Sequence, residues 1–407
     1  MRAQYEVVSV MKIFVIPTWH PTSFKPLWAN WVIPHIDLLR EAGHEVSVLQ
    51  LGFDGAPIEN GRDKWSQEIQ SIGNRHLYLR APTPSKFQRN RFLYGTLLHQ
   101  YGCLMENLFS AAVSNWGLPD VLHAHVSLPG GYLAAEIGDK FNLPVIVQEH
   151  YSGFKSDARF PWRVGSYAKL MNKRSQGFYA VSRGFADTIV ETNLVHVTGV
   201  LPNPIDTDLF SPDHVVHKSD HCRIVTVGNI GKIKGSDILF EALSKLPREI
   251  DWRLYHVGDC THVEKYIKDI GDVSLIERIT CLGKLPQTEL AKVFSKSDLY
   301  VVSSRRETAN TSMLQAMSCG VPVVTTRCGG PETLLHESVS VLVENENPDD
   351  LARGIAFVIQ NRNKFDPNAM RKFVIDHYSK PVVLKLVEKA YEEAIAKKRI
   401  ERGASDY

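Results

Sequence analysis

The residues best suited to chemistry lie close together in 303–332, SSRRETANTSMLQAMSCGVPVVTTRCGGPE. The pattern is typical of a strand end, a polar loop, a short helix that stops at Gly320, and a second strand. Asn310 and Thr311 are residue types that begin helices, and a helix N-terminus binds phosphate through its free N–H groups and its dipole. Glu307 precedes this helix, where its carboxylate can accept hydrogen bonds from sugar hydroxyls. Capping the helix is an equally compatible role for it.

A second candidate is the glycine-rich segment 227–235, VGNIGKIKG, which follows a predicted strand and opens a predicted helix. Glycines allow a backbone to approach a diphosphate closely, and Lys232 and Lys234 add positive charge. The segment is not a P-loop, because Ile233 stands where that motif requires Ser or Thr. By itself it is also compatible with a plain glycine-rich turn that carries solvated lysines.

Two histidines lie on a third predicted strand, DVLHAH at 120–125. Residues two apart in a strand point the same way, so His123 and His125 share a face. His125 is nearest the carboxyl end, where ligands of parallel sheets bind. His150 ends the next strand, VIVQEH, in the analogous place. No third ligand lies at a recognisable spacing, so we predict no metal at this pair.

The elements that must position these residues alternate between strand and helix along the whole chain. Such alternation predicts parallel sheets covered by helices on both faces, an α/β architecture. The expected strands are 12–16, 45–51, 121–126, 144–148, 177–181, 223–227, 252–257, 279–282, 299–302, 322–325 and 339–343. The expected helices lie near 31–42, 129–140, 183–192, 235–246, 287–296, 311–319 and 347–360.

The alternation occurs twice, so we predict two Rossmann-like doubly wound domains, 1–204 and 205–377, with the ligand site in a cleft between them. They meet in the proline-rich segment 200–212, VLPNPIDTDLFSP, which suits a stiff linker. Asp206-Thr-Asp208 lies in this linker, where a turn or capping role is expected rather than a metal site. Residues 381–395 carry one apolar stripe and form a separate amphipathic helix, and 396–407 are expected to fray.

The composition is that of a globular protein. The chain has 407 residues, 43% of them hydrophobic and 23% charged, which is too apolar for a disordered protein. Its 47 Lys and Arg residues against 45 Asp and Glu leave a net charge of +2, so we expect no nucleic-acid partner. The six cysteines form no Cys-x-x-Cys pair, which fits reduced thiols in the cytoplasm.

The sequence predicts no membrane-spanning segment but does contain a basic stretch. No apolar run approaches the roughly 18 residues of a spanning helix. Arg2 followed by Glu6 makes a poor secretory signal, and 1–10 are expected to be a dispensable extension. Residues 61–100 carry seven Lys or Arg against two acids. We expect a cytoplasmic protein, with peripheral contact to anionic lipid at the inner face of the membrane; a solvated basic loop is the alternative.

Six segments, taken together and in order, carry a family resemblance. They are GHEVSVL (43–49), DVLHAH (120–125), LPNPIDTDLF (201–210), VGNIGKIKG (227–235), LGKLP (282–286) and the block 303–332. With these segments the sequence resembles the retaining glycosyltransferases of family 4, which have the GT-B architecture of two Rossmann-like domains facing across a cleft. The last helix, 378–398, resembles the family's tail, which packs back on the N-terminal domain.

The resemblance implies transfer of a sugar from a nucleotide-sugar donor to a glycan or lipid-linked acceptor in surface polysaccharide or glycolipid biosynthesis. It implies retention of the anomeric configuration by front-face substitution, without a metal or other cofactor. Lys234 would neutralise the donor diphosphate, Glu307 would hold hydroxyls of the donor sugar, and His125 would lie near the reacting carbon. The implied donor-binding set is Asn229, Gly231, Lys232, Gly258, Lys284, Ala309, Asn310, Thr311 and Gln315, with the backbone of 309–311 cradling the phosphates. His150 and Asn30 are assigned to the acceptor side or left uncertain.

Three residues depart from the family pattern. Gln315 replaces a second Glu that touches the nucleotide ribose, and an amide can still bond a hydroxyl, so weaker or altered donor binding is expected. Asn229 replaces an Arg, and Asn30 stands where the first loop, 17–30, usually has a glycine. The departures keep two alternatives open: a degenerate sugar-nucleotide-binding protein without turnover, and a sugar-nucleotide epimerase of the same fold.

Overall fold

The computed structural model describes residues 9–21, 30–52, 69–81, 91–156, 160–212, 220–335 and 339–405. The chain divides into two compact units. The first unit comprises Met1–Val181, Ala186–Asn203 and Val383–Tyr407, and the second comprises Ser182–Phe185 and Pro204–Val382. Within the described ranges, every helix is too short or too polar to cross a membrane.

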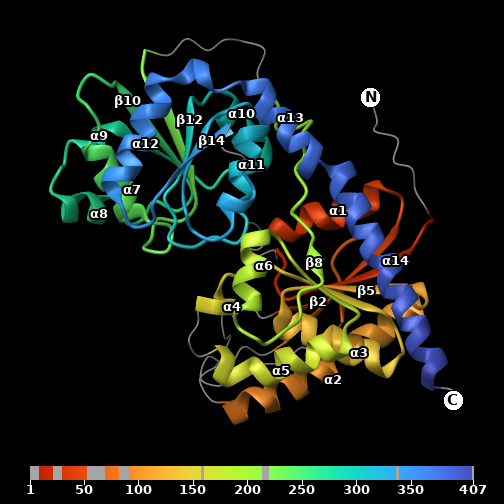
Figure 1. Ribbon diagram of the computed structural model, residues 1–407. Helices are drawn as coiled ribbons and strands as arrows, with labels where there is room; N and C mark the ends of the chain where they lie inside the picture. The colour runs from red at the N-terminus through yellow and green to blue at the C-terminus, as the bar shows by residue number, and fades with distance from the viewer. Residues whose placement is uncertain are drawn as a thin grey trace. The chain divides into compact units, whose positions relative to one another are not determined.

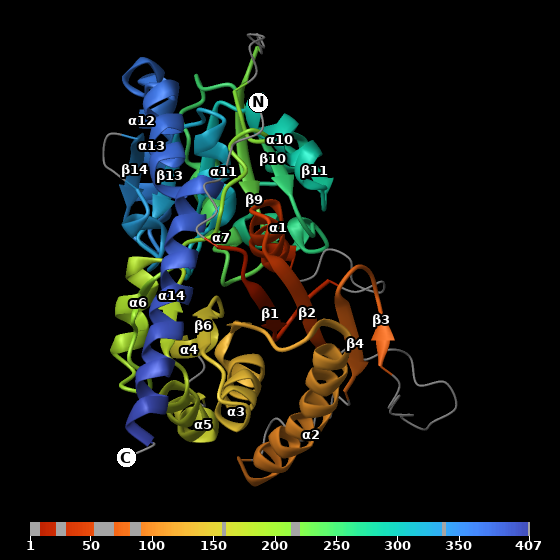
Figure 2. The same cartoon turned by 90° about the vertical axis from the view of Figure 1, so that its right-hand side faces the viewer.

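The first unit is built on an eight-stranded sheet with the order β3-β4-β2-β1-β5-β6-β7-β8. All neighbours are parallel except β3, which runs antiparallel to β4 at the edge seen in Figure 2. The strands are β1 (Lys12–Pro17), β2 (Glu45–Gly52), β3 (Gln70–Ser71), β4 (His76–Arg80), β5 (Val121–His125), β6 (Val145–Glu149), β7 (Gly177–Ala180) and β8 (Gly199–Val200).

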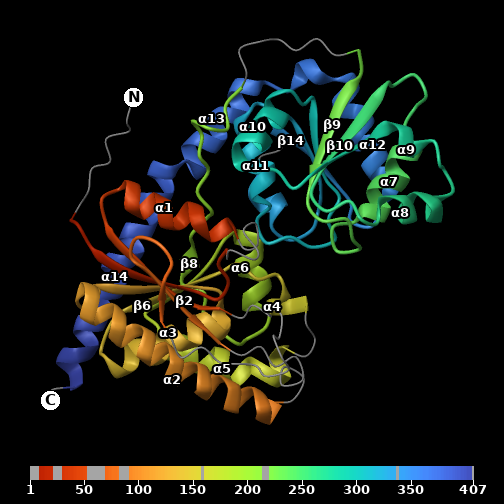
Figure 3. The ribbon, with the colours of Figure 1, turned by 180° about the vertical axis from the view of Figure 1, so that it is seen from behind.

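Helices cover both faces of this sheet. Its helices are α1 (Ile33–Glu41), α2 (Arg91–Trp116), α3 (Tyr132–Lys140), α4 (Gly153–Ser156), α5 (Phe160–Arg174), from Ala186 on α6 (Arg183–Val190), and from Val383 on α14 (Lys380–Ser405). Figure 3 shows α2, α3 and α5 together on one side, with α1 and α14 on the other. The alternation of side chains in β1 explains this: Ile13 and Val15 belong to the core with α1 and α14, whereas the ring of Phe14 lies 5.9 Å from that of Phe109 in α2.

Some sequence expectations for this unit need correction. Residues 396–407 were expected to fray, but α14 continues to Ser405, because Ala394 is buried and Lys398 lies almost fully buried beyond it. The strands β3, β4 and β8 and the long helices α2 and α5 were not expected. Part of the basic stretch 61–100, namely 61–68 and 82–90 with four of its seven Lys and Arg residues, lies outside the described residues.

The second unit is a six-stranded, fully parallel sheet with the order β11-β10-β9-β12-β13-β14. Counted from the first strand of the unit, this is 3-2-1-4-5-6, the order of a dinucleotide-binding sheet, in which the direction of winding reverses between β9 and β12. The strands are β9 (Cys222–Val227), β10 (Trp252–Val257), β11 (Ile279–Gly283), β12 (Leu299–Val302), β13 (Val323–Thr326) and β14 (Ser340–Val343). Each residue of β12 and β13 is buried, as a central strand requires.

The helices of this unit are α7 (Ser236–Ser244), α8 (Val263–Ile270), α9 (Leu275–Arg278), α10 (Gln287–Ser295), α11 (Thr311–Ser318), α12 (Pro348–Gln360) and α13 (Pro367–Tyr378). Figure 1 shows α7 and α12 on one face of the sheet and α10, α11 and α13 on the other. Local sequence sets their starts: Asn347 caps α12 by accepting from the Asp350 N–H, and a proline follows it at the first helical position.

A buried hydrogen bond joins the start of β2 to α14 in the first unit. The Nδ1 atom of His44 accepts from the Met11 N–H at 3.2 Å, so its proton is on Nε2, which donates to Glu388 Oε1 at 3.1 Å. Both side chains are almost fully buried. His44 of the GHEV segment therefore has a structural role, which is to fix the C-terminal helix on the sheet.

Replacing Glu388 by Leu should lower the free energy of unfolding by about 1–3 kcal/mol, because the buried Nε2–H of His44 then has no acceptor. Glu388→Gln is the matched control, since its amide oxygen can still accept, and it should cost less. Urea unfolding of both variants measures the difference. Equal losses in the two variants would show that this hydrogen bond does not anchor α14.

Candidate active site

A pocket opens at the carboxyl edge of the second sheet, where β9 and β12 separate. Its wall comes from the ends of β9, β10 and β12, the loops after β9 and β12, the first turns of α7, and the residue that caps α11. The lining includes Gly228, Asn229, Lys234, His256, Tyr300, Ser303, Ser304 and Asn310. In a doubly wound sheet, this reversal point is where ligands bind.

A short ion pair joins a residue of the pocket wall to a carboxylate beside it. Lys234 Nζ lies 2.6 Å from Glu307 Oε1, although 73 residues separate them in the sequence. The same oxygen accepts from Ser304 Oγ at 2.8 Å and from Asn310 Nδ2 at 3.3 Å. The side chain of Glu307 is only 11% exposed, whereas that of Lys234 is 39% exposed. Within the described residues no donor binds Oε2, so this oxygen stays available to a ligand.

Asn310 sets the start of α11 and the shape of the pocket together. Its backbone is left-handed, with φ at +46°, a conformation that Asn tolerates better than most residues. Its Oδ1 accepts from the Met313 N–H at 3.1 Å and from the buried Tyr300 hydroxyl at 3.3 Å, while its Nδ2 donates to Glu307. One side chain therefore caps the helix, meets the floor of the pocket and orients the carboxylate.

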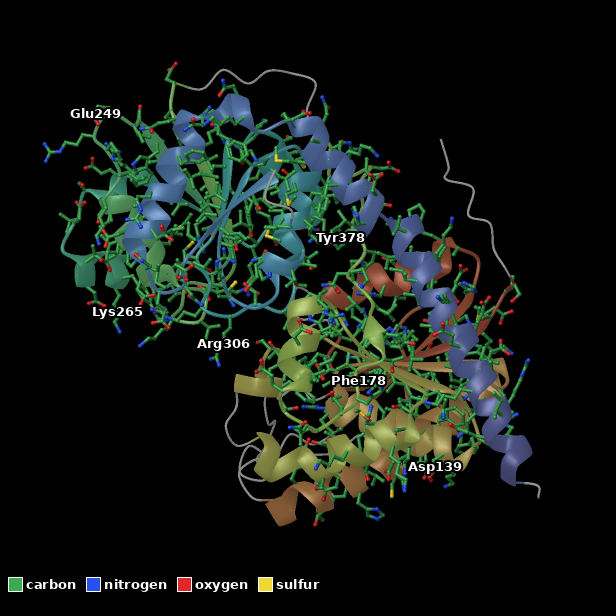
Figure 4. All side chains as sticks on the ribbon, viewed as in Figure 1. Asp139, Phe178, Glu249, Lys265, Arg306 and Tyr378 are labelled. Carbon is green, nitrogen blue, oxygen red and sulfur yellow. The ribbon has the colours of Figure 1, made fainter. Side chains whose placement is uncertain are left out.

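A bidentate pair holds the glycine-rich loop in place. The Arg305 guanidinium donates to both carboxylate oxygens of Asp237, at 2.7 and 2.9 Å, and to the Lys232 carbonyl at 2.6 Å. Its backbone N–H also donates to the Ile233 carbonyl. Arg306, the next residue, is instead exposed at the surface (Figure 4). Arg305 is thus a positioning residue for the loop that carries Lys234.

Two glycines allow the loops around the pocket to touch. A Cβ at Gly258 would lie 2.0 Å from the Gly228 carbonyl oxygen, and φ there is +140°. A Cβ at Gly235 would lie 1.9 Å from the Ser303 carbonyl oxygen. A Cβ at Gly231 would meet nothing within 4 Å, so the open space beside it is free for a ligand.

In the first unit, histidines gather at the carboxyl ends of β5 and β6. The rings of His123 and His125 stack with centroids 4.3 Å apart, and His125 Nδ1 lies 3.0 Å from His150 Nε2. The His35 ring lies 5.2 Å from that of His125, and Trp31 stacks on His150 at 4.0 Å. Among the described residues, no group of three or more His, Cys, Asp or Glu is arranged to hold a metal ion.

The Glu149 carboxylate fixes the backbone around His150. This buried carboxylate accepts from the Ser127 N–H at 2.9 Å, the His150 N–H at 2.9 Å and the Tyr151 N–H at 2.7 Å, and from the Ser127 hydroxyl. Burial raises its pKa in spite of these hydrogen bonds. The backbone turn after β6 is therefore held rigidly where it presents His150.

Two family models match the chain, one to each half. "Glycosyltransferase Family 4" matches residues 35–209 and "Glycosyl transferases group 1" matches residues 221–361. The chain belongs to glycosyltransferase family 4. Its fold is of the GT-B type, which solved structures of similar chains also indicate.

Curated relatives of this family 4 chain act on different acceptors according to their names. It is 29% identical over 197 residues to a phosphatidylinositol N-acetylglucosaminyltransferase component from Arabidopsis thaliana, covering 48% of this chain and 44% of that protein. It is 26% identical to the N-acetyl-alpha-D-glucosaminyl L-malate synthase of Bacillus anthracis, over 55% of this chain and 61% of the relative. The matches thus span about half to two thirds of these relatives' own lengths.

Solved structures share the fold over nearly the whole family 4 chain. Sucrose-phosphate synthase from Thermosynechococcus elongatus superposes with a TM-score of 0.73 at 17% identity, covering 95% of this chain and 100% of that chain. Anabaena HepE in complex with UDP-glucose gives 0.65 at 15% identity, covering 94% and 99%. At these identities the likeness establishes the architecture.

The structure brings together some of the residues that the family resemblance singles out. Asn229, Lys234 and Asn310 line the pocket and Glu307 adjoins it. Lys232 and Lys284 are exposed outside the lining, and Gln315 donates to Gln287 on α10 at 2.8 Å. The structure also locates the remaining residues of the predicted set. Gly231 lies in the glycine-rich loop next to open space, and Ala309 is buried. Thr311 is the first residue of α11, and Asn30 precedes α1. Their ligand contacts stay predictions.

Some residues of this family 4 site could not be found from the sequence. Arg305 lies close to Glu307 in the sequence, but its partner Asp237 lies on α7, and only folding shows the pair. His35 and Trp31 joined the histidine cluster without any motif of their own. The turn role expected for Asp206 is confirmed, since its carboxylate accepts from the Leu209 N–H at 2.9 Å and also pairs with Lys380 at 2.8 Å.

The histidine cluster makes stability depend on pH. Burial, and to a smaller extent repulsion from His35, lower the pKa of His123 to about 3. Burial lowers the pKa of His35 to about 4, and the pKa values of His125 and His150 fall well below the ordinary 6.5 for the same reason. Because each folded-state pKa lies below its unfolded value, the unfolded chain binds protons that the folded chain cannot once pH falls below 6.5.

Lowering the pH from about 7 to about 5 should therefore reduce the free energy of unfolding by several kcal/mol, at up to about 1.4 kcal/mol per histidine per pH unit. His35→Gln, which keeps a donor to Asn203, should reduce that slope by roughly one histidine's share. Urea unfolding followed by Trp fluorescence measures it, because six of the seven tryptophans belong to the first unit. Identical slopes in wild type and variant would contradict this account.

Proposed function

We propose that this chain is a retaining glycosyltransferase that moves a sugar from a nucleotide-sugar donor to a glycan or lipid-linked acceptor, without a metal cofactor. The observation that most supports this proposal is the ion pair between Lys234 and Glu307, at the point where the winding of the second sheet reverses. Lys234 offers a partly exposed cation for a diphosphate, and Glu307 offers a carboxylate oxygen for sugar hydroxyls. Both groups are oriented before any ligand arrives.

The proposed reaction is front-face substitution. The bond between the anomeric carbon and the diphosphate oxygen breaks while the acceptor hydroxyl oxygen bonds the same carbon from the same side. The acceptor's proton passes to an oxygen of the departing diphosphate, and the nucleoside diphosphate leaves with that proton. Positive charge develops on the sugar and negative charge on the leaving group.

The chain's own residues would stabilise that charge. Lys234, with Lys232 nearby on the same loop, would neutralise the leaving diphosphate, and the N-terminus of α11 would add its dipole. Preorganised groups of this kind typically contribute several kcal/mol to lowering a barrier. Of the described residues that line the pocket, none is acidic, and the adjoining Glu307 carboxylate is paired with Lys234. The place of His125 near the reacting carbon stays a prediction.

The donor is proposed to be a sugar attached to a nucleoside diphosphate. A similar structure, Anabaena HepE, is described in complex with UDP-glucose, and a relative from Mycolicibacterium smegmatis is named as GDP-mannose-dependent. The departures at Asn229 and Gln315 would retune the affinity, since both still carry amide groups that can bond hydroxyls or phosphates.

A panel of UDP, GDP and ADP sugars should contain one donor that raises the melting temperature, because a ligand that binds only the folded state stabilises it by mass action. Lys234→Ala should lower the affinity for that donor by about tenfold to a hundredfold, the loss expected for a charge-assisted hydrogen bond. Lys372→Ala, an exposed lysine on α13 paired with Asp376, is the matched control and should bind as wild type does. No shift with any donor would count against the proposal.

Turnover separates the proposal from the alternatives. Release of nucleoside diphosphate that depends on acceptor supports a transferase, and NMR of the product then reports whether the anomeric configuration is retained. Binding without release would support the degenerate binding protein, and conversion of donor without acceptor would support the epimerase.

We also propose a cytoplasmic location at the inner face of a membrane, with a lipid-linked acceptor in surface polysaccharide or glycolipid synthesis. Three relatives carry phosphatidylinositol in their names, which supports an acceptor of this class. The basic and aromatic stretch 85–101 supplies the charge for contact with anionic lipid.

Vesicles that contain phosphatidylserine should therefore sediment part of the protein at low salt, and added salt should release it, because screening weakens surface attraction. Vesicles of phosphatidylcholine alone are the control and should sediment little. Replacing Lys86, Arg89 and Arg91 by Gln should abolish the difference. Equal behaviour with both lipids would argue against this surface as a membrane contact.

A further inference from the structure

One side chain in the pocket wall was not singled out by the sequence. His256 is the next-to-last residue of β10, and its side chain lines the pocket together with Lys234 and Asn310. Trp252 and Leu254 share its face of the strand and are buried apolar residues. Only at the carboxyl end, where the strand reaches the pocket, does this face carry a polar group.

His256 is buried without a hydrogen-bond partner. Its exposed fraction is 4%, and neither Nδ1 nor Nε2 has a partner among the described residues. Buried polar atoms are bonded in the great majority of folded proteins, so an orphan imidazole calls for a physical explanation. A ligand that enters the pocket can supply the missing partner.

The groups beside His256 are those proposed to meet phosphate. The end of β10 touches the glycine-rich loop, since a Cβ at Gly258 would fall 2.0 Å from the Gly228 carbonyl oxygen. The side chain of Lys234 lies against Gly228 from the same loop. His256 therefore adjoins the part of the pocket that holds the cation, and a diphosphate is the portion of a nucleotide sugar that this part would attract.

We propose that His256 is a donor-binding residue whose imidazole N–H donates to the diphosphate of the nucleotide sugar. This inference rests on the proposed function and adds to it a contact that Lys234 and the start of α11 do not supply. The imidazole is part of the pocket wall, and its neutral form has one N–H donor and one nitrogen acceptor. Before the ligand arrives that donor is unpaired, so it is available without breaking another bond.

The charge of His256 should respond to the ligand. Burial lowers its pKa; the Gly228 backbone, which lies near the ring without forming a well-aligned hydrogen bond, and the charge of Asp259 offset part of this, so the free pocket holds a neutral ring. A bound diphosphate brings negative charge, which favours the protonated form. Among the described residues, the other titratable or charged groups at the pocket are Lys234 and Tyr300 in its lining and Glu307, which adjoins it through its bond to Lys234. Donor binding should therefore take up a proton near neutral pH.

The test is calorimetric titration of the wild-type chain with UDP-glucose, GDP-mannose and ADP-glucose at about pH 6 and about pH 8. Two buffers of different ionisation enthalpy give the number of protons taken up. In nucleotide sugars both phosphates are esterified, so neither titrates in this range. The variants are His256→Phe, which keeps the ring and removes both nitrogens, and His256→Gln, which keeps an N–H but cannot titrate. His262→Gln, an exposed histidine outside the lining, is the control.

We expect the wild type to bind its donor more tightly at the lower pH, with proton uptake. His256→Phe should bind about tenfold or more weakly and take up no proton. His256→Gln should lose less affinity but also take up no proton, and His262→Gln should match the wild type. If His256→Phe fails to fold, as circular dichroism would show, the test rests on His256→Gln, which should bind the donor without taking up a proton.

Two other results would overturn the inference and tell its failure from that of the proposed function. If the wild type binds a donor and both His256 variants bind equally with unchanged proton uptake, only the His256 contact is wrong. If the wild type binds none of the three donors, the proposed function is wrong and the contact falls with it.

Discussion

The second unit depends on one carboxylate oxygen. Oε1 of Glu307 accepts from Lys234, Ser304 and Asn310, which come from three separate segments of the chain. Because an almost buried carboxylate is costly unless it is paired and hydrogen-bonded, these three donors must stay in place for the site to exist. The glycine-rich loop, the end of β12 and the start of α11 are therefore held in one arrangement.

The sheet positions these segments. The parallel strands β9 and β12 bring two loops to the same edge, and Arg305 and Asp237 then join the loop to α7 through a bidentate pair. A bidentate pair fixes direction as well as distance. The close contact of Gly258 with Gly228 removes the remaining freedom, since no larger side chain fits there. The pocket is thus formed by rigid elements before a ligand binds, which lowers the cost of binding.

The first unit differs from the second, because the side chains gathered at the end of its sheet are neutral histidines and not charged groups. His35, His123, His125 and His150 come from a helix, a strand and a loop, and burial keeps them uncharged near neutral pH. Glu149 holds the turn that presents His150, and the hydrogen bond of His123 to the Tyr391 hydroxyl ties the cluster to α14. The C-terminal helix therefore contributes to this cluster as well as to the core.

The sequence alone determined the α/β class, most strands, and the two segments that carry Lys234 and Glu307. It did so because apolar runs, glycines and helix-starting residues are local signals with a fixed spacing. The sequence could not determine which of those residues meet: Lys234 and Glu307, Arg305 and Asp237, or His256 and the glycine-rich loop. Such contacts join positions far apart along the chain, and only the order and register of the strands decide them. The continuation of α14 to Ser405 has the same cause, because burial against the sheet stabilises a terminus that its own polar sequence would leave to fray.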